Sequence, residues 1–489
     1  MLLQLVCGSA LLFPDEGWGQ GRGRPAGRGD AASEVTALVG ATVIDVMRGE
    51  RLTDQVVEVA GGRVRAVVPR RSWRRASGTR VVALTGRFII PGLWDMHVEQ
   101  ALPLWDRAPL DSNASLFHPI FLAYGVTGVR DVAGDMAVLR RWRDAIDGGE
   151  RAGPRIVFTG PKVGMAAVAP GAPDPVRTRA DVESTVAALK GGGASAVYLY
   201  ELAEPLLDAL ASSARRHGLS LEGNVPLSTT LRRQAQSGQR VVDHLDGVLL
   251  SSSTDEAAVR RTLRLLEERP WWARAAWKVG LLQRPEHPTT LALERFSEAR
   301  AESLFVQLAE KRVYQVPTLR MLAVLNRSGD SAVRLPPAPL QLRSPRRPWQ
   351  GWPAEPVPAS HPLARANARA AWSVRTMHRL GVPVLAGSDT PNLYAAPGLS
   401  LHDELALLVR AGLTPLEAVQ SATWRVAQYL GATDSLGTVA PGRVADLLVL
   451  AGDPTVDIAN TRRIEMVMVR GRLHDAPALA AWRAQGTSM

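Results

Sequence analysis

One short stretch, Arg87-Phe-Ile-Ile-Pro-Gly-Leu-Trp-Asp-Met-His-Val-Glu99, constrains the fold of this chain more than any other. Its Pro-Gly pair turns the backbone, because proline cannot continue a helix or an interior strand. The residues that follow the turn predict a strand. Since side chains alternate between the two faces of a strand, Asp95, His97 and Glu99 share one face. Burying three such groups is costly without a purpose, so this face predicts a metal or proton-transfer site.

Short alternating segments occur near both ends of the chain. The first group covers residues 36–84, where Gly61-Gly62 between two apolar runs indicates a hairpin. A small β unit of this kind cannot bury both of its faces alone. We therefore expect it to pair with the similar segments at 438–450 and 464–473.

The central part of the chain alternates between strand-like and helix-like segments, as (β/α) units do. Eight strand candidates fall at 93–99, 123–131, 155–160, 196–200, 219–226, 240–245, 312–319 and 381–389. The pattern predicts an α/β fold, a (β/α)8 TIM barrel with a small composite β-sandwich domain built from N- and C-terminal segments. In such a barrel the chemistry lies at the carboxyl ends of the strands.

These patterns divide the chain into a barrel at 92–435, a composite β domain at 36–91 and 436–475, and a leader at 1–35. The barrel carries insertions near 251–300 and 327–362, at strand ends where lids and substrate walls occur. Helix packing is the favoured interpretation of the tryptophans in the first insertion, over stacking on a substrate; they are Trp271, Trp272 and Trp277.

The leader leaves localisation open. Residues 1–13 are apolar but no basic residue precedes them, so they resemble a poor or truncated signal peptide. Residues 14–33 have the composition of a disordered segment. The cytoplasm is slightly favoured over export. Cys7 is the only cysteine, which excludes an internal disulfide and a thiolate-rich zinc site.

The formal charge of +11 does not predict nucleic-acid binding. The basic residues are nearly all arginine, are scattered along the chain, and are not interleaved with stacking aromatics. No apolar run approaches the roughly 20 residues that span a bilayer. We therefore expect a small-molecule substrate, with no nucleic-acid partner and no membrane span.

The chain resembles the imidazolonepropionase-like branch of the amidohydrolase superfamily over residues 36–475. The resemblance rests on the apolar-Pro-Gly-x-x-Asp-x-His stretch and on Gly437-Thr-Val-Ala-Pro-Gly-Arg-Val-Ala-Asp-Leu. Its most specific part is 381–430, which contains Ala386-Gly-Ser-Asp-Thr-Pro, Leu401-His-Asp-Glu-Leu and Ala411-Gly-Leu-Thr-Pro-Leu-Glu-Ala. The resemblance implies a hydrolase that acts on a C–N bond, in an amide or a cyclic amide, with one or two divalent metals.

The family's metal ligands carry over only in part. His97, His244 and Asp389 stand at the positions of a strand-one histidine, the strand-six histidine and the strand-eight aspartate. Glu99 replaces the second strand-one histidine. The two remaining positions are lost, with Tyr198 where a carboxylated strand-four lysine is expected and Asn224 where a strand-five histidine is expected.

This reduced set argues against two metals, because the bridging lysine that holds two cations together is missing. One divalent metal, Zn²⁺, Mn²⁺ or Fe²⁺, remains compatible with His97, Glu99 and Asp389 as ligands. Glu222 has two interpretations, an extra oxygen ligand or a buried carboxylate paired with an arginine. The alternative is that this site binds no metal.

Two functions therefore compete. In the first, a hydrolase with at most one metal, Asp389 transfers the proton of the attacking water and His244 donates a hydrogen bond as charge develops. The second is a metal-free descendant, either a small-molecule binder or a repurposed lyase, cyclase or isomerase that uses His97, Glu99, Tyr198 and His244. A core histidine and a helix-capping aspartate are the structural interpretations of His244 and Asp389.

Overall fold

A computed structural model describes residues 35–102, 110–164, 175–267, 288–326, 357–358, 360–392 and 395–485. Several sequence predictions lie outside these residues. They concern the leader, of which only residue 35 is described, and therefore also Cys7. They also concern the three tryptophans of the first insertion and most of the segment 327–362.

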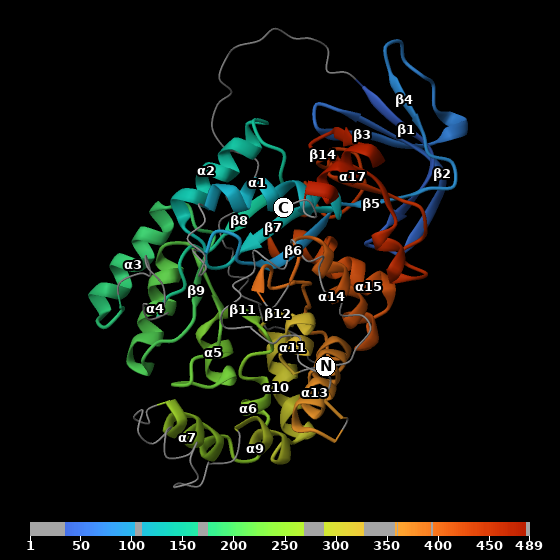
Figure 1. The fold of residues 1–489 in the computed structure, drawn as a ribbon. Coiled ribbons are helices and arrows are strands. Elements are labelled where there is room, and N and C mark those ends of the chain that lie inside the picture. The colour runs from blue at the N-terminus through green and yellow to red at the C-terminus, as the bar shows by residue number, and fades with distance from the viewer. Residues whose placement is uncertain are drawn as a thin grey trace, which may run out of the picture.

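An eight-stranded sheet brings the two ends of the chain together. Its order is β15-β14-β13-β5-β1-β2-β3, with β4 paired to β1. Strand β5 pairs antiparallel with β13, where Ile90 lies opposite Leu448, so the pairing that the sequence predicted between distant segments is present. Figure 1 shows the blue and red strands lying together. The strands are β1 (Thr36–Asp45), β2 (Glu50–Ala60), β3 (Arg63–Pro69), β4 (Arg80–Ala83), β5 (Phe88–Pro91), β13 (Leu447–Leu450), β14 (Ile464–Val469) and β15 (Arg472–His474).

The central strands are parallel and form two sheets. The first has the order β6-β7-β8, and the second has the order β12-β11-β10-β9. Their bounds are β6 (Leu93–Val98), β7 (Val126–Asp131), β8 (Arg155–Phe158), β9 (Ala196–Leu199), β10 (Ser220–Gly223), β11 (Gln239–Asp243) and β12 (Tyr314–Val316). Each observed strand falls within or at the edge of a segment that the sequence predicted.

Isolated parallel bridges connect the edges of these two sheets. Val163 bridges to Leu199, Gln315 to Val384, and Val98 to Thr390. The predicted strand at 381–389 therefore forms bridges rather than a continuous ladder. One reason is that the Ala386 amide donates to Ser421 O instead of to a neighbouring strand. The division into domains and the closed eight-stranded barrel remain predictions.

Helices follow the parallel strands and cover them, as Figure 1 shows. Several begin at a side chain that caps the first turn, such as Asp135 before α2 and Thr178 before α3. No helix among the described residues is long and apolar enough to cross a membrane. The helices are α1 (Leu110–Ala123), α2 (Met136–Asp147), α3 (Arg179–Gly191), α4 (Glu204–Arg216), α5 (Leu231–Ser237), α6 (Val248–Ser251), α7 (Glu256–Glu267), α9 (Pro288–Glu294), α10 (Glu298–Glu310), α11 (Leu319–Leu325), α13 (Pro362–Arg379), α14 (Leu399–Arg410), α15 (Pro415–Ser421), α16 (Trp424–Tyr429) and α17 (Ala476–Gln485).

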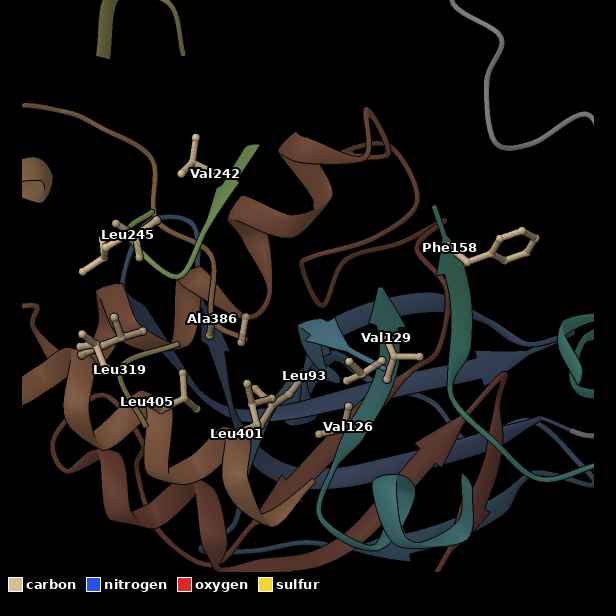
Figure 2. Packing of buried hydrophobic residues seen from close by; sticks show 14 of the residues in the cluster. Leu93, Val126, Val129, Phe158, Val242, Leu245, Leu319, Ala386, Leu401 and Leu405 are labelled. Carbon is tan, nitrogen blue, oxygen red and sulfur yellow. The ribbon is translucent and has the colours of Figure 1, made fainter. Parts of the chain in front are cut away.

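A large apolar cluster holds the strands against the helices. Figure 2 shows members from the strands, such as Leu93 and Val126, together with Leu401 and Leu405 of α14. All four side chains are fully buried. Close packing of this kind fixes the strand positions, and hence the positions of the polar side chains at the strand ends.

Candidate metal centre

Three potential metal ligands converge at the carboxyl ends of the parallel segments. His97, His244 and Asp389 each offer one ligand atom, and these atoms lie within 4.8 Å of one another. His97 belongs to β6, His244 directly follows β11, and Asp389 lies beyond the bridge at Val384. His97 and Asp389 are buried, whereas His244 is partly exposed. The sequence had singled out all three.

His97 lies between two carboxylates. Its Nδ1 is 3.2 Å from Oδ1 of Asp243, and its Nε2 is 3.2 Å from Oδ1 of Asp389. Neither nitrogen has an aligned hydrogen-bond partner among the described residues. Burial lowers the pKa of His97, but the charges of Asp243, Asp389 and Glu99 outweigh it and hold the pKa well above its usual value. Without a metal, the protonated form of this imidazole is favoured.

His244 is neutral and presents Nε2 to the same cluster. Its Nδ1 lies 2.8 Å from Oγ1 of Thr318, whose hydroxyl proton is donated to Pro317 O. Nδ1 of His244 therefore carries the proton, and the lone pair resides on Nε2. Burial and the neighbouring charge of His97 lower the pKa of His244 to about 4. A neutral imidazole with a free Nε2 is the form that binds metals.

The backbone at these strand ends has the left-handed conformation. The φ angles are +62° at His244, +46° at Thr318 and +61° at Asp389. Such angles cost energy for residues with a side chain and are concentrated at functional sites. Three such residues gather at these strand ends, which supports the interpretation of this region as a site. Asp389 does not cap α14, because that helix begins at Leu399.

Glu99 lies next to this group of three but is engaged by two other residues. Its Oε1 forms an ion pair with the Lys162 ammonium, and its Oε2 accepts a hydrogen bond from Asn392 at 2.8 Å. The distance from Oε1 to Nε2 of His97 is 3.8 Å. Burial alone would raise the pKa of Glu99, but Lys162 and then His97 overcome this and hold the pKa well below its usual range. These contacts do not support the prediction that Glu99 is a metal ligand.

Tyr198 and Asn224, which occupy the two lost ligand positions, contact each other. The Tyr198 hydroxyl donates to Oδ1 of Asn224 at 3.1 Å, and Nδ2 of Asn224 donates to Asp246 at 3.1 Å. Burial, together with the charges of Asp243 and Glu99, raises the pKa of Tyr198 well above its usual value. Tyr198 is therefore a neutral phenol, and the side chains of Tyr198 and Asn224 are hydrogen-bonded to each other beside the site.

Glu222 belongs to a separate buried network. Its Oε2 lies 2.9 Å from the Arg130 guanidinium, and its Oε1 accepts hydrogen bonds from Tyr429 and Ser220 at 2.7 Å. The same guanidinium lies 3.3 Å from Asp243, and both side chains of this second pair are fully buried. Of the two interpretations that the sequence left open for Glu222, the structure shows the arginine pair. Arg130 thereby fixes Asp243, which in turn contacts His97.

The residues at the site fit one divalent cation. Two imidazole nitrogens and one carboxylate oxygen form a common donor set for Zn²⁺, Mn²⁺ or Fe²⁺, and Asp243 on Nδ1 of His97 is the kind of outer carboxylate that orients a ligating histidine. The buried Nε2 of His97, with no aligned partner among the described residues, is the atom such a cation would satisfy. Glu99, Tyr198 and Asn224, which stand at the remaining ligand positions of the family, are engaged by other residues as described above.

Sequence reasoning missed four residues that shape this site: Lys162, Arg130, Asp243 and Asn392. Lys162 follows β8 closely, so the rule that polar residues at strand ends are functional would have selected it. Arg130 is a lone basic residue in an apolar strand, which is also a signal. Asn392 lies in an irregular segment and gave no such signal.

Comparison with known proteins supports the fold. Residues 357–474 match the model of the amidohydrolase family. This match includes Asp389 but neither histidine of the cluster.

Two curated relatives are similar over short stretches. Adenine deaminase 3 of Rhizobium meliloti is 46% identical over 65 residues, which are 13% of this chain and 10% of the relative. Imidazolonepropionase of Pyrobaculum arsenaticum is 41% identical over 75 residues, 15% of this chain and 18% of the relative. The chain thus matches less than a fifth of the length of each of these relatives.

The likeness to solved structures extends over most of the chain. Bottromycin amidohydrolase superposes with a TM-score of 0.68 and 23% identity, covering 93% of this chain and 91% of that protein. At this identity the likeness concerns the fold alone. The local family match and the fold likeness agree with each other, and together they support the amidohydrolase superfamily.

Proposed function

We propose that this protein is a hydrolase that cleaves a C–N bond, in an amide or a cyclic amide, with at most one divalent cation held by His97, His244 and Asp389. The observation that carries the proposal is the convergence of their three ligand atoms within 4.8 Å in a chain with the fold of this superfamily. This ligand set differs from the one that the sequence predicted, because His244 takes the place of Glu99.

The chemistry that a bound divalent cation supplies is polarisation of the scissile carbonyl and a lower pKa for water, towards about 7. The protein's contribution is to hold the metal-binding side chains in position. Asp243 and Arg130 hold His97 from one side, and Thr318 holds His244 through Nδ1. The site is therefore rigid before any substrate arrives, as electrostatic catalysis requires.

Asp389 is the proposed proton carrier. Asn392 donates to its Oδ1 at 3.1 Å and to Glu99 at 2.8 Å, so one amide group orients both carboxylates. Asp389 takes a proton from the attacking water and returns it to the leaving nitrogen, which must be protonated to depart. His244 is the partly exposed member of the cluster.

The proposed architecture around this site is a closed (β/α)8 TIM barrel with a composite β-sandwich domain. The bridges at Val163, Gln315 and Val98 support closure, since each joins the edge of one parallel segment to the next. The eight-stranded sheet formed by segments 36–91 and 447–474 supports the composite domain.

A metal-free acid–base catalyst is the second candidate, and one observation favours it. Part of the buried negative charge of the site is compensated without a bound cation, because Lys162 pairs with Glu99 and His97 lies between Asp243 and Asp389. Such a site could serve a lyase, cyclase or isomerase step, or only bind a small molecule.

One experiment separates these candidates. The protein is stripped with a chelator, reconstituted with Zn²⁺, Mn²⁺ or Fe²⁺, and assayed on a panel of N-acyl amino acids, lactams and adenine. Hydrolysis that depends on the added metal supports the proposal. Turnover of the same compounds that is unchanged by chelation supports the metal-free catalyst. Thermal stabilisation by a panel compound without turnover supports a binder.

A further inference from the structure

The segment after β8 fixes a lysine against the neighbouring strand. Val163 bridges to Leu199, its amide donates to Tyr198 O at 2.8 Å, and its carbonyl accepts from the Tyr200 amide at 2.9 Å. These bonds determine where the preceding residue, Lys162, directs its side chain. That side chain is 8% exposed.

The ammonium of Lys162 has three neighbours. It forms an ion pair with Oε1 of Glu99, and it lies 5.1 Å from the ring centroid of Tyr198 and 5.7 Å from that of Tyr200. Aromatic faces attract cations, so the two rings and the carboxylate together form a cation pocket. The occupant of this pocket is a side chain of the protein itself.

This pocket adjoins the metal cluster. Glu99, the carboxylate in it, lies 3.8 Å from Nε2 of His97 and shares Asn392 with Asp389. Both oxygens of Glu99 are engaged, one by Lys162 and the other by Asn392. The lysine ammonium therefore lies beside the oxygen of Glu99 that a second cation would otherwise use.

We propose that the ammonium of Lys162 takes the place of a second divalent cation, neutralises Glu99, and so limits the site to one metal. Lys162 is a positioning residue in this account, because it acts through Glu99. The inference rests on the proposed function, since it assumes that the cluster of His97, His244 and Asp389 holds the first metal.

The physical reason is the cost of an unpaired buried charge. Removing one partner of a buried ion pair leaves the other charge without compensation, which is strongly unfavourable. In Lys162→Met, Glu99 and the two aromatic rings would remain with no cation between them. A divalent cation in solution would relieve that cost, and oxygen ligands suit Mn²⁺ well.

The test counts metals in four proteins: the wild type, Lys162→Met, Lys162→Arg, and the double variant Lys162→Met/Glu99→Gln. Each is stripped with a chelator, saturated with Mn²⁺, freed of excess, and measured by elemental analysis, with intact mass and thermal-unfolding midpoint recorded in parallel. We expect about one Mn²⁺ per chain in the wild type, in Lys162→Arg and in the double variant, and about two in Lys162→Met. The double variant, which buries no unpaired charge, should also unfold at a higher temperature than Lys162→Met.

The outcomes distinguish this inference from the proposed function. Two metals in the wild type, with or without the added mass of a carboxylated lysine, overturn the inference and the limit of one cation, but leave the proposed hydrolysis of a C–N bond standing. One metal in Lys162→Met at saturating Mn²⁺ also overturns the inference. No metal in any of the four proteins overturns both. If Lys162→Met does not fold, the wild type and the double variant decide, because a second metal in either contradicts the account.

Discussion

Nε2 of His97 lies 3.2 Å from Oδ1 of Asp389, where the first parallel strand meets the last parallel segment of the chain. The backbone supports this contact directly, since the Asp389 amide donates to His97 O at 2.9 Å and Val98 bridges to Thr390. Residues from both ends of the central region thus meet at one point. The candidate metal centre depends on this junction.

Replacing Asp389 by asparagine should abolish hydrolysis while leaving the protein folded. Asparagine keeps the shape and the contact with Asn392 but cannot carry the proton, so we expect turnover to fall by about 100-fold or more. Steady-state assays and the thermal-unfolding midpoint check this. Asp208→Asn, at a surface pair with Arg233, is the matched control and should retain activity. Full activity in Asp389→Asn would exclude Asp389 as the proton carrier.

Replacing Arg130 by methionine should destabilise the protein by about 3–5 kcal/mol, because it removes the buried cation that pairs with two buried carboxylates. Asp243 and Glu222 are both fully buried beside this guanidinium. Thermal unfolding measures the loss. Arg233→Met removes an arginine from an exposed pair and should change stability by at most about 0.5 kcal/mol. Equal unfolding midpoints for the two variants would contradict the role of Arg130 as the centre of the network.

Glu222→Gln should lower the unfolding temperature but leave the metal content unchanged. Its carboxylate pairs with Arg130 and accepts hydrogen bonds from Tyr429 and Ser220, and it does not belong to the cluster of three ligands. Elemental analysis of the folded variant beside the wild type provides the test. A folded variant that has lost its metal would make Glu222 a ligand after all.

Acid should destabilise the protein in part through His402. This histidine is buried, with Nδ1 2.9 Å from Thr461 and Nε2 2.9 Å from Tyr124 O. Burial and then the charge of Arg462 lower its pKa to about 3, whereas the unfolded chain has a value near 6.5. The unfolded state therefore binds the extra proton first, and the free energy of unfolding falls as the pH drops from about 6.5 towards 3.

Unfolding midpoints between pH 7 and pH 4.5 test this assignment. His402→Gln should have a shallower pH dependence than the wild type, because one titrating group is removed. Thr461→Val removes a hydrogen-bond partner but keeps the histidine, so its midpoints should be lower at every pH with the slope retained. A wild-type slope in His402→Gln would show that other groups control the acid sensitivity.

Much of the site was predictable because the side chains follow from strand positions. His97, His244 and Asp389 each stand at or just beyond the end of a predicted parallel segment, and such ends meet at one edge. The superfamily assignment, made on the motifs around Pro91-Gly92 and in 381–430, is confirmed by the family match and the fold likeness.

The ion pairs were not predictable in the same way. Glu99 was expected to face a metal, because alternation along β6 says which face a side chain occupies but not what lies opposite. Lys162 reaches Glu99 only because the segment after β8 is bonded to β9. Arg130 pairs with Glu222 and Asp243 across three strands, which no local pattern encodes.

The most direct test of the central claim is the metal content of the wild-type protein beside that of His244→Ala. The account predicts about one divalent cation per wild-type chain after saturation with Zn²⁺, Mn²⁺ or Fe²⁺ and removal of excess, and a clear loss in His244→Ala. A wild-type protein that holds no metal under these conditions would contradict it.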